Sequence, residues 1–384
     1  MFLRVAADNI FGAAQGRFAV DHRFEMGRAQ NIMNSANAVN PLGVAIRRHV
    51  GQAGGVGENK SGHLCWVAEK FKRCYRAFMI SSQDITKAAD LLLAGALVVF
   101  PTETVYGLGA LATDDKAVAR IYEAKGRPSF NPLISHVAEV DAAFALGEFS
   151  ADALKLAARF WPGPLTLVVP RWSTCNVSLL ASAGLPSLAI RVPQHPIALE
   201  LLRAVGQPVV APSANRSGRM SPTNAQHVRD GLGDKVAMML DGGPCAVGVE
   251  STVISFLDGK AVLLRSGGLA RDVIEAALGY ALGEAHEGVM HSPGQMASHY
   301  APHAAMRLNA EAPIGGEAYL GFGKFGGAYN LSSSGDVVEA AANLFRMLHE
   351  IDAMMPACIA VAPIPMTGLG EAINDRLKRA AAPR

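Results

Sequence analysis

Cysteine is scarce in this sequence and is never closely paired. Five cysteines lie far apart among 384 residues, and no two of them form a Cys-x-x-Cys motif. Zinc knuckles and disulfide frameworks depend on close or regular cysteine spacing, so neither is predicted. We expect inert or buried thiols in a reducing compartment, and therefore a cytoplasmic protein.

Long apolar runs are missing as well. Runs such as residues 88–100 and 165–170 are shorter than the roughly 20 apolar residues that a membrane-spanning helix needs. No basic stretch followed by an apolar core and a small-residue cleavage site opens the chain, which argues against a secretory signal. We therefore expect no association with a membrane.

The chain also lacks a large excess of charge of one sign, since its net charge is only +2. Residues 1–78 carry 11 Lys and Arg against 5 Asp and Glu, whereas the remaining residues carry 24 against 28. The basic N-terminal part could contact nucleic acid. A remainder with a net charge of −4 is not expected to attract RNA by its field. Direct tRNA binding therefore stays open, and nucleotide binding must come from a local site.

The composition is that of a globular protein, and the sequence divides into two ordered blocks. A length of 384 residues also favours two domains rather than one. Residues 1–78 show no sustained hydrophobic period, so we expect a disordered extension or a start assigned upstream of Met79. From residue 79 onward, predicted strands and helices alternate, with a helix over 115–125 and a strand over 165–170. A second, smaller block begins near residue 305. The alternation predicts an α/β fold with a twisted, mixed sheet and a small second α/β domain.

Polar clusters follow several of the predicted strands. PTETVYGLG at 101–109 comes directly after the strand over 97–100, and its hydroxyls and bare N–H groups could surround a small ligand. An ordinary strand-to-helix turn is the alternative. APSANRSG at 211–218 suits phosphate oxygens or a metal-bound water, or else an Asx turn. Glu250–Thr252 opens another strand in the same manner.

Basic side chains form a second group of candidates. Lys125 and Arg127 could clamp a phosphate, or could simply complement a helix dipole. His136 fits an ordinary strand histidine at least as well as a catalyst. Arg191 and Arg265 lie in apolar strands without adjacent acids, so each needs an anionic ligand or a distant protein acid.

A glycine motif in the second block is a weaker candidate. GFGKFG at 321–326 is a literal Gly-x-Gly-x-x-Gly after a predicted strand. A dinucleotide site would require a helix that begins at the last glycine, and an acid about 20 residues later. The sequence shows neither, so we do not expect this segment to bind a nucleotide.

Taken in order, the polar clusters resemble the YrdC-like domain of threonylcarbamoyl-AMP synthases. The matching segments are PTETVYGLG at 101–109, KGRP at 125–128, NPL at 131–133, WPGPLTLV at 161–168, RVP at 191–193, APSANRSG at 211–218, ESTV at 250–253 and LRSGG at 264–268. SPGQMASHYAP at 292–302 resembles the linker of the longer members, and residues 368–381 resemble the end of their Rossmann-like domain. The resemblance implies a YrdC-like catalytic domain over 79–290, a linker over 291–304 and a Rossmann-like domain over 305–384.

The resemblance also implies an activity. A nucleotidyltransferase of this family would convert ATP, L-threonine and bicarbonate into L-threonylcarbamoyl-AMP and pyrophosphate. The product would pass to a tRNA threonylcarbamoyl transferase for the threonylcarbamoyladenosine modification. Mg²⁺ would accompany ATP, bridging its phosphate oxygens with few protein ligands, so no separate metal site of the protein is expected.

The residues implied for the site fall into three groups. Those expected around threonine are Thr104, His136, Arg191, Ala211 and Ser251. Those expected around ATP are Arg127, Asn131, Ser187, Ser213, Ser221, Arg265 and the linker residue Tyr300. Those expected to act in catalysis, on phosphates and magnesium, are Lys125, Arg127, Ser213 and Asn215 of the KxR and SxN signatures.

Two other functions remain possible on the sequence. A carbamoyl-adenylate enzyme that uses carbamoyl phosphate would carry larger partner domains and zinc-type cysteine pairs, which are absent here. A non-catalytic RNA-binding module of the same fold would need a basic face, which the net charge of residues 79–384 disfavours.

Overall fold

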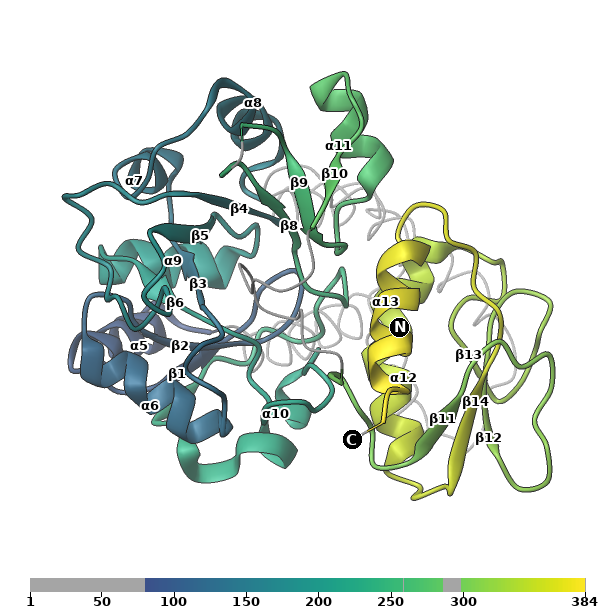
Figure 1. Ribbon diagram of the computed structural model, residues 1–384. Helices are drawn as coiled ribbons and strands as arrows, with labels where there is room; N and C mark the ends of the chain where they lie inside the picture. The colour runs from purple at the N-terminus through teal and green to yellow at the C-terminus, as the bar shows by residue number, and fades with distance from the viewer. Residues whose placement is uncertain (1–79, 258, 286–297, 384) are drawn as a thin grey trace, which may run out of the picture. The chain divides into compact units, whose positions relative to one another are not determined.

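The computed structural model describes residues 80–257, 259–285 and 298–383. The predicted N-terminal extension (1–78) and most of the predicted linker (291–297) lie outside the described residues. Two sheets organise the rest, and each has its own hydrophobic core (Figure 1). We call described residues 80–285 the large-sheet domain and residues 305–383 the C-terminal domain.

The large-sheet domain is built on a sheet of mixed direction, as predicted. Its strands lie in the order β10-β9-β8-β4-β5-β3-β6-β2-β1-β7. Four neighbouring pairs are parallel (β1–β7, β3–β5, β4–β8 and β9–β10), and the others are antiparallel. The bounds are β1 (Val98–Phe100), β2 (Gly107–Leu111), β3 (Ile134–His136), β4 (Leu165–Pro170), β5 (Ser187–Arg191), β6 (Val209–Val210), β7 (Met238–Met239), β8 (Thr252–Ser255), β9 (Val262–Arg265) and β10 (Gly283–Glu284).

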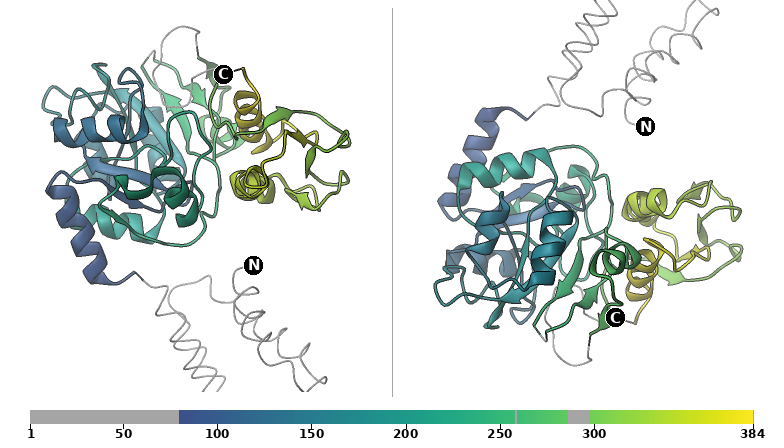
Figure 2. Two further views of the ribbon diagram at one scale, coloured as in Figure 1. Left: turned by 90° about the horizontal axis from the view of Figure 1, so that it is seen from below. Right: turned by 90° about the horizontal axis from the view of Figure 1, so that it is seen from above.

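Helices cover this sheet and leave its polar loops to form the site. Helix α5 packs against α9, and α8 packs against α11 (Figure 2). The bounds are α5 (Ser82–Leu93), α6 (Asp115–Lys125), α7 (Val140–Phe144), α8 (Ala151–Phe160), α9 (Pro196–Val205), α10 (Ala225–Leu232), the short 3₁₀ helix η2 (Gly233–Lys235) and α11 (Arg271–Leu278).

Local signals fix both ends of α6, which places two site candidates. The Asp114 carboxylate accepts hydrogen bonds from the N–H groups of Lys116 and Ala117, at 2.8 and 3.2 Å. Gly126 ends the helix with a φ of 60°, which glycine adopts without a steric cost. Lys125 therefore occupies the last helical position, and Arg127 begins the loop that follows.

The segment 101–109 is not the strand-to-helix turn that we considered. Residues from Gly107 onward form β2, which pairs antiparallel with β1. A Cβ atom on Gly109 would lie 2.9 Å from Cε1 of Phe100 and 3.0 Å from the carbonyl oxygen of Val98. Glycine is needed at this position because the Phe100 side chain lies close to the backbone. The glycines of this segment are also typical of turns, so the sequence did not identify the strand.

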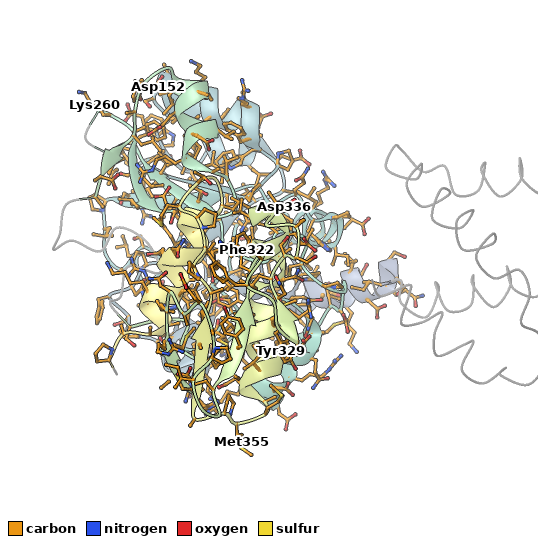
Figure 3. The ribbon with its side chains drawn as sticks, turned by 90° about the vertical axis from the view of Figure 1, so that its right-hand side faces the viewer. Asp152, Lys260, Phe322, Tyr329, Asp336 and Met355 are labelled. Atoms are coloured by element: carbon orange, nitrogen blue, oxygen red, sulfur yellow. The ribbon has the colours of Figure 1, made fainter. Side chains whose placement is uncertain are left out.

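The C-terminal domain has an all-parallel sheet of order β11-β14-β12-β13, which agrees with the Rossmann-like expectation. Its elements are β11 (Ala305–Arg307), β12 (Ala318–Gly321), β13 (Tyr329–Asn330), α12 (Val337–Asp352), β14 (Cys358–Val361) and α13 (Gly370–Ala380). Both helices lie on the same face of the sheet in Figures 1 and 2. Asp336, labelled in Figure 3, caps α12 by accepting from the N–H of Val338 at 2.7 Å.

The glycine motif of this domain forms a tight turn. Phe322 and Phe325 face each other across an isolated bridge, and Gly323 has a φ of 55°. The next helix begins only at Val337, so no helix N-terminus follows the last glycine. None of the helices in the described part of the chain is long and apolar enough to cross a membrane.

Candidate active site

A cavity of about 50 Å³ brings together polar loops that are far apart in the sequence. Nine of the fourteen residues predicted for the site line it, namely Thr104, Arg127, His136, Arg191, Ala211, Ser213, Ser251, Arg265 and Tyr300. Two further polar residues that the sequence reasoning did not assign, Glu250 and His299, line it as well. The two ends of the cavity differ in their partners and are described in turn.

Arg191 dominates one end and has the protein acid that the sequence left in question. Its Nη2 lies 2.6 Å from Oε1 of Glu103, its Nη1 donates to Thr104 Oγ1 at 2.9 Å and its Nε donates to the Gly163 carbonyl at 3.1 Å. A guanidinium carries five N–H donors, so two remain beyond these three bonds. The pairing is structural, yet Arg191 can still present a fork to a carboxylate in the cavity.

His136 is the direct neighbour of Arg191 across the β3–β5 ladder. Its Nδ1 lies 3.1 Å from the Ile134 carbonyl. Burial, followed by the charge of Arg191, lowers the pKa of His136 to about 3. The imidazole is therefore neutral near pH 7, and the positive charge at this end comes from Arg191.

Arg265 and Ser251 form the facing wall. The Nε and Nη2 atoms of Arg265 donate to the Ser251 carbonyl at 3.1 and 2.9 Å. The Ser251 hydroxyl lies 3.2 Å from Nη2 of Arg265 and 2.7 Å from the hydroxyl of Thr166. These contacts orient the guanidinium from behind, which suits a side chain that must meet a ligand in a fixed position.

Lys125 lies just behind the cavity and fastens one of its loops. Its ammonium donates to the carbonyl oxygens of Ser213 and Asn215, both at 2.5 Å. Burial, and then the charge of Arg127, lower the pKa of Lys125 well below its ordinary value. A nearby anion would favour the charged form again. The KxR and SxN signatures are thus joined by direct hydrogen bonds.

The remaining predicted residues lie outside the cavity lining, each for a different reason. Ser221 donates its hydroxyl to Oε1 of Glu250, which itself lines the cavity. The side-chain amide of Asn131 is fully buried without a hydrogen-bond partner, and the same holds for Oδ1 of Asn215. Ser187 lies at the far end of the strand that carries Arg191. Buried amide atoms without hydrogen-bond partners usually indicate a position where a ligand or a water molecule binds.

Linker residues close one side of the cavity. His299 and Tyr300 are buried at 6 % and 1 % exposure, and both line it. Burial lowers the pKa of His299 to about 3, against the charge of Glu250 and together with the charges of Arg127, Lys125 and Arg265. The pKa of the Tyr300 phenol is raised, chiefly by burial. Both side chains are therefore neutral and cover the cavity without adding charge.

Positive charge prevails in the lining. Three guanidinium groups (Arg127, Arg191 and Arg265) face one carboxylate (Glu250). Burial lowers the pKa of Arg127, but only to about 10, so this side chain stays charged near pH 7. A buried excess of cations is stable only with an anionic partner, which points to phosphate and carboxylate ligands.

Comparisons with known proteins agree with this arrangement. The family described as "Telomere recombination" (Sua5/YciO/YrdC) matches residues 90–267, and "Threonylcarbamoyl-AMP synthase, C-terminal domain" matches residues 269–382. A threonylcarbamoyl-AMP synthase of Bacillus subtilis is 41 % identical over 335 residues, which are 79 % of this chain and 95 % of the relative. The chain belongs to the threonylcarbamoyl-AMP synthase family.

A solved structure matches most of this chain in fold. The crystal structure of P. abyssi Sua5 complexed with L-threonine has a TM-score of 0.73 and 38 % identity, over 79 % of this chain and 95 % of that one. The synthase of Pyrococcus abyssi is 40 % identical over 331 residues, 79 % of this chain and 96 % of the relative. The predicted family, the predicted fold and the predicted nucleotidyltransferase activity are therefore confirmed.

Proposed function

We propose that this cavity is the place where the chain joins L-threonine, bicarbonate and ATP. The observation that carries the proposal is the excess of three buried guanidinium groups over one carboxylate, that of Glu250, in the lining. The three substrates are all anionic or carry a carboxylate, so each would gain from these cations. No side chain needs to act as a nucleophile, because positioning and charge stabilisation are sufficient for phosphoryl chemistry.

In the proposed reaction, the threonine amine and bicarbonate form a carbamate with loss of water. A carbamate oxygen then attacks the α-phosphorus of ATP, and the bond from that phosphorus to the bridging oxygen of pyrophosphate breaks. Arg191, with Thr104 and His136 beside it, would hold the threonine carboxylate. Arg127 and Arg265 would stabilise the charge that spreads over the phosphate oxygens. The L-threonine complex of P. abyssi Sua5 supports the choice of amino acid.

Magnesium would accompany ATP in this proposal. Among the described residues, no three His, Cys, Asp or Glu side chains gather into a metal site. The buried Oδ1 atoms of Asn131 and Asn215 lack partners and are oxygen ligands of the kind Mg²⁺ accepts, directly or through water. These residues fit an ion that is held mainly by the triphosphate. When bound, the ion would neutralise part of the phosphate charge.

His299 and Tyr300 would have to move during the proposed cycle. A cavity of about 50 Å³ holds only a few water molecules and is far smaller than a typical ligand site of roughly 300 Å³ or more. ATP can therefore enter only if His299 and Tyr300 shift outward. Their return would exclude water from the mixed anhydride, which hydrolysis would otherwise destroy. A tRNA threonylcarbamoyl transferase would then receive the product.

Pyrophosphate release by the whole chain tests the proposal. We expect release from ATP only when threonine and bicarbonate are both present, with ¹⁴C from bicarbonate appearing in a nucleotide product. Release that is independent of threonine would contradict the proposed reaction. Incorporation from carbamoyl phosphate in place of bicarbonate would instead favour the carbamoyl-adenylate alternative.

A further inference from the structure

One arginine of the C-terminal domain reaches the wall of the cavity. Arg376 lies on α13 and its side chain is only 1 % exposed. Its Nε lies 2.9 Å from Oε2 of Glu250 in the large-sheet domain. Its Nη1 donates to the Ser266 carbonyl at 2.7 Å and to Asp375 Oδ2 at 2.9 Å. A cation this deeply buried between two domains is costly, so its partners explain why it is there.

Glu250 is the carboxylate of the cavity lining. One of its oxygens accepts from Ser221 and the other from Arg376. Burial alone would raise the pKa of Glu250, but Arg376, Arg265 and the Ser221 hydroxyl outweigh burial and lower it. Glu250 is therefore ionised within a cavity whose proposed ligand is a triphosphate. Without a compensating cation, that negative charge would repel the ligand.

The same arginine supports the linker. Its Cζ lies 5.2 Å from the centre of the Tyr300 ring, a cation–π distance. Tyr300 also packs against Phe345 of α12, with ring centres 5.7 Å apart. The φ of Tyr300 is 62°, a left-handed conformation that costs a bulky residue free energy. Packing against the C-terminal domain holds Tyr300 in this conformation at the cavity.

We propose that Arg376 is a positioning residue that completes the ATP side of the site from the C-terminal domain. It neutralises the charge of Glu250 and holds the Tyr300 ring in place. ATP would then meet a lining of net positive charge, with Tyr300 packed at its side. The inference rests on the proposed function of the cavity. It also assigns a role in ATP binding to the C-terminal domain, because α13 must be docked before Arg376 can neutralise Glu250.

The expected signature is a selective loss of ATP affinity. In Arg376→Met, the uncompensated Glu250 would face the triphosphate, so the KM for ATP should rise by about 30-fold, the effect of truncating one partner of a buried charge pair. The KM for threonine should change less than about 2-fold, because Arg191 and Glu103 remain intact. Arg376→Lys keeps the charge but loses the guanidinium geometry, so its KM for ATP should lie between those of the unmodified protein and Arg376→Met.

A second-site change separates charge compensation from a merely structural role. Glu250→Gln removes the charge that Arg376 cancels, so the double variant Glu250→Gln/Arg376→Met should recover most of the ATP affinity that Arg376→Met loses. Arg271→Ala is the matched control, because Arg271 also pairs with α13, through Glu371 at 2.8 Å, and does not line the cavity. The control should lower Tm without changing the KM for ATP.

The pH profile gives an independent readout. In Arg376→Met the pKa of Glu250 should rise, so the KM for ATP should fall as the pH is lowered from 8 to 6, relative to the KM of the unmodified protein at each pH. ATP and bicarbonate titrate alike for both proteins, so the difference between the two proteins reports on Glu250. The guanidinium of Arg265 stays charged although burial lowers its pKa, and the imidazole of His299 and the phenol of Tyr300 stay neutral. Asp375 pairs with Arg376 itself.

Steady-state pyrophosphate release by the full chain, with Tm for every variant, decides the matter. Equal losses for ATP and threonine in Arg376→Met, or a loss of the same size in Arg271→Ala, would overturn the inference in favour of simple domain docking. If Arg376→Met does not fold, Arg376→Lys with and without Glu250→Gln gives the same comparison, and no recovery by Glu250→Gln would overturn it too. Absence of threonine-dependent release in the unmodified protein would instead contradict the proposed function.

Discussion

Two buried arginine–glutamate pairs flank the cavity, and they are built differently. Arg191 and Glu103 lie 88 residues apart within the large-sheet domain, at 2.6 Å. Arg376 and Glu250 lie 126 residues apart and join the two domains, at 2.9 Å. Each pair is less than a tenth exposed, so neither is an ordinary surface salt bridge. The first exists whenever the large sheet is folded, whereas the second exists only when the C-terminal domain is docked.

This difference separates the two halves of the proposed chemistry. In this proposal, the threonine side would be held by strand ends and would be present before any substrate arrives. The ATP side would include the charge of Arg376 on α13 and the ring of Tyr300. Substrate order and water exclusion can then be controlled on the ATP side alone. An enzyme that makes a hydrolysable anhydride benefits from this division, because the site is complete only in the closed state.

Breaking the first pair should have the largest effect. Arg191→Ala leaves Glu103 buried without its cation, which should cost about 3–5 kcal/mol of unfolding free energy. Threonine binding should also weaken by about 2–5 kcal/mol, while the affinity for ATP changes little. Thermal unfolding and titration with each substrate measure both losses. Arg191→Lys keeps the charge but loses the fork, so threonine affinity should fall more than stability does.

The double variant Glu103→Gln/Arg191→Met makes this prediction sharper. Removing both charges should restore much of the stability, since no unpaired charge remains buried. It should not restore threonine binding if Arg191 holds the substrate carboxylate. Recovery of both properties would show that the pair is purely structural.

The sequence shows both acids, Glu103 in PTETVYGLG and Glu250 in ESTV, but does not indicate which arginine each of them meets. Arg191 and Arg265 were recognised as buried charges because their strands are apolar, but their partners come from distant loops. Glu103 was seen only as part of a polar cluster, and nothing in its neighbours indicates which arginine it meets. Local rules identify a charge that needs a partner, and only the topology of the sheet identifies the partner.

The predictable part of the fold shows the converse. Helix α6 has the predicted bounds because Asp114 and Gly126 determine them within a few residues. Strand β4 also has the predicted bounds, since an apolar run determines them locally. Helix α5 also begins at a local signal, because Ser81 caps it and Asp84 completes the capping box from the third position.

A Lys125 variant tests whether the loop over Ser213–Asn215 belongs to the part of the site that forms without the C-terminal domain. Lys125→Met removes the donor to two buried carbonyl groups, so we expect a loss of about 1–3 kcal/mol of unfolding free energy. The loop over Ser213–Asn215 should loosen, and the KM for ATP should rise more than that for threonine. Urea unfolding and kinetics on the same samples measure both. An unchanged stability would mean that water replaces the ammonium without cost.

The anchor of the linker offers a smaller, pH-dependent test of the second half. Asp352 of α12 accepts from the N–H groups of His303 and Ala304, at 2.8 and 3.0 Å. Burial would raise the pKa of Asp352, but these donors outweigh burial and lower it. A lowered pKa means that the stabilisation is present above the unfolded value of about 4 and is lost as the pH falls through the folded value.

Asp352→Asn should therefore lower the unfolding free energy by about 1 kcal/mol at pH 7, because the amide oxygen still accepts a hydrogen bond but no longer carries a charge. At pH 3 the two proteins should differ less, because the carboxylate of the unmodified protein is then partly protonated. Urea unfolding at both pH values checks the sign. A difference that grows as the pH falls would contradict the assignment.

The smallest effect is expected at Ser187, and it bears on how one strand serves both halves. Ser187 and Arg191 lie on the same face of β5, because side chains four residues apart in a strand point the same way. At about 3.3 Å per residue they are roughly 13 Å apart, a span suited to a ligand with threonine at one end and a nucleotide at the other.

Ser187→Ala should raise the KM for ATP by about 2- to 10-fold, the worth of one hydrogen bond, and leave the KM for threonine unchanged. Because the lost group is a single hydroxyl, Tm should move little. Ser135→Ala on the neighbouring strand β3 is a control for the loss of a buried strand hydroxyl, because Ser135 has no predicted contact with either substrate. A change in threonine affinity at Ser187 would mean that the two substrates are not separated along β5, and the division between a preformed half and a docked half would have to be drawn elsewhere.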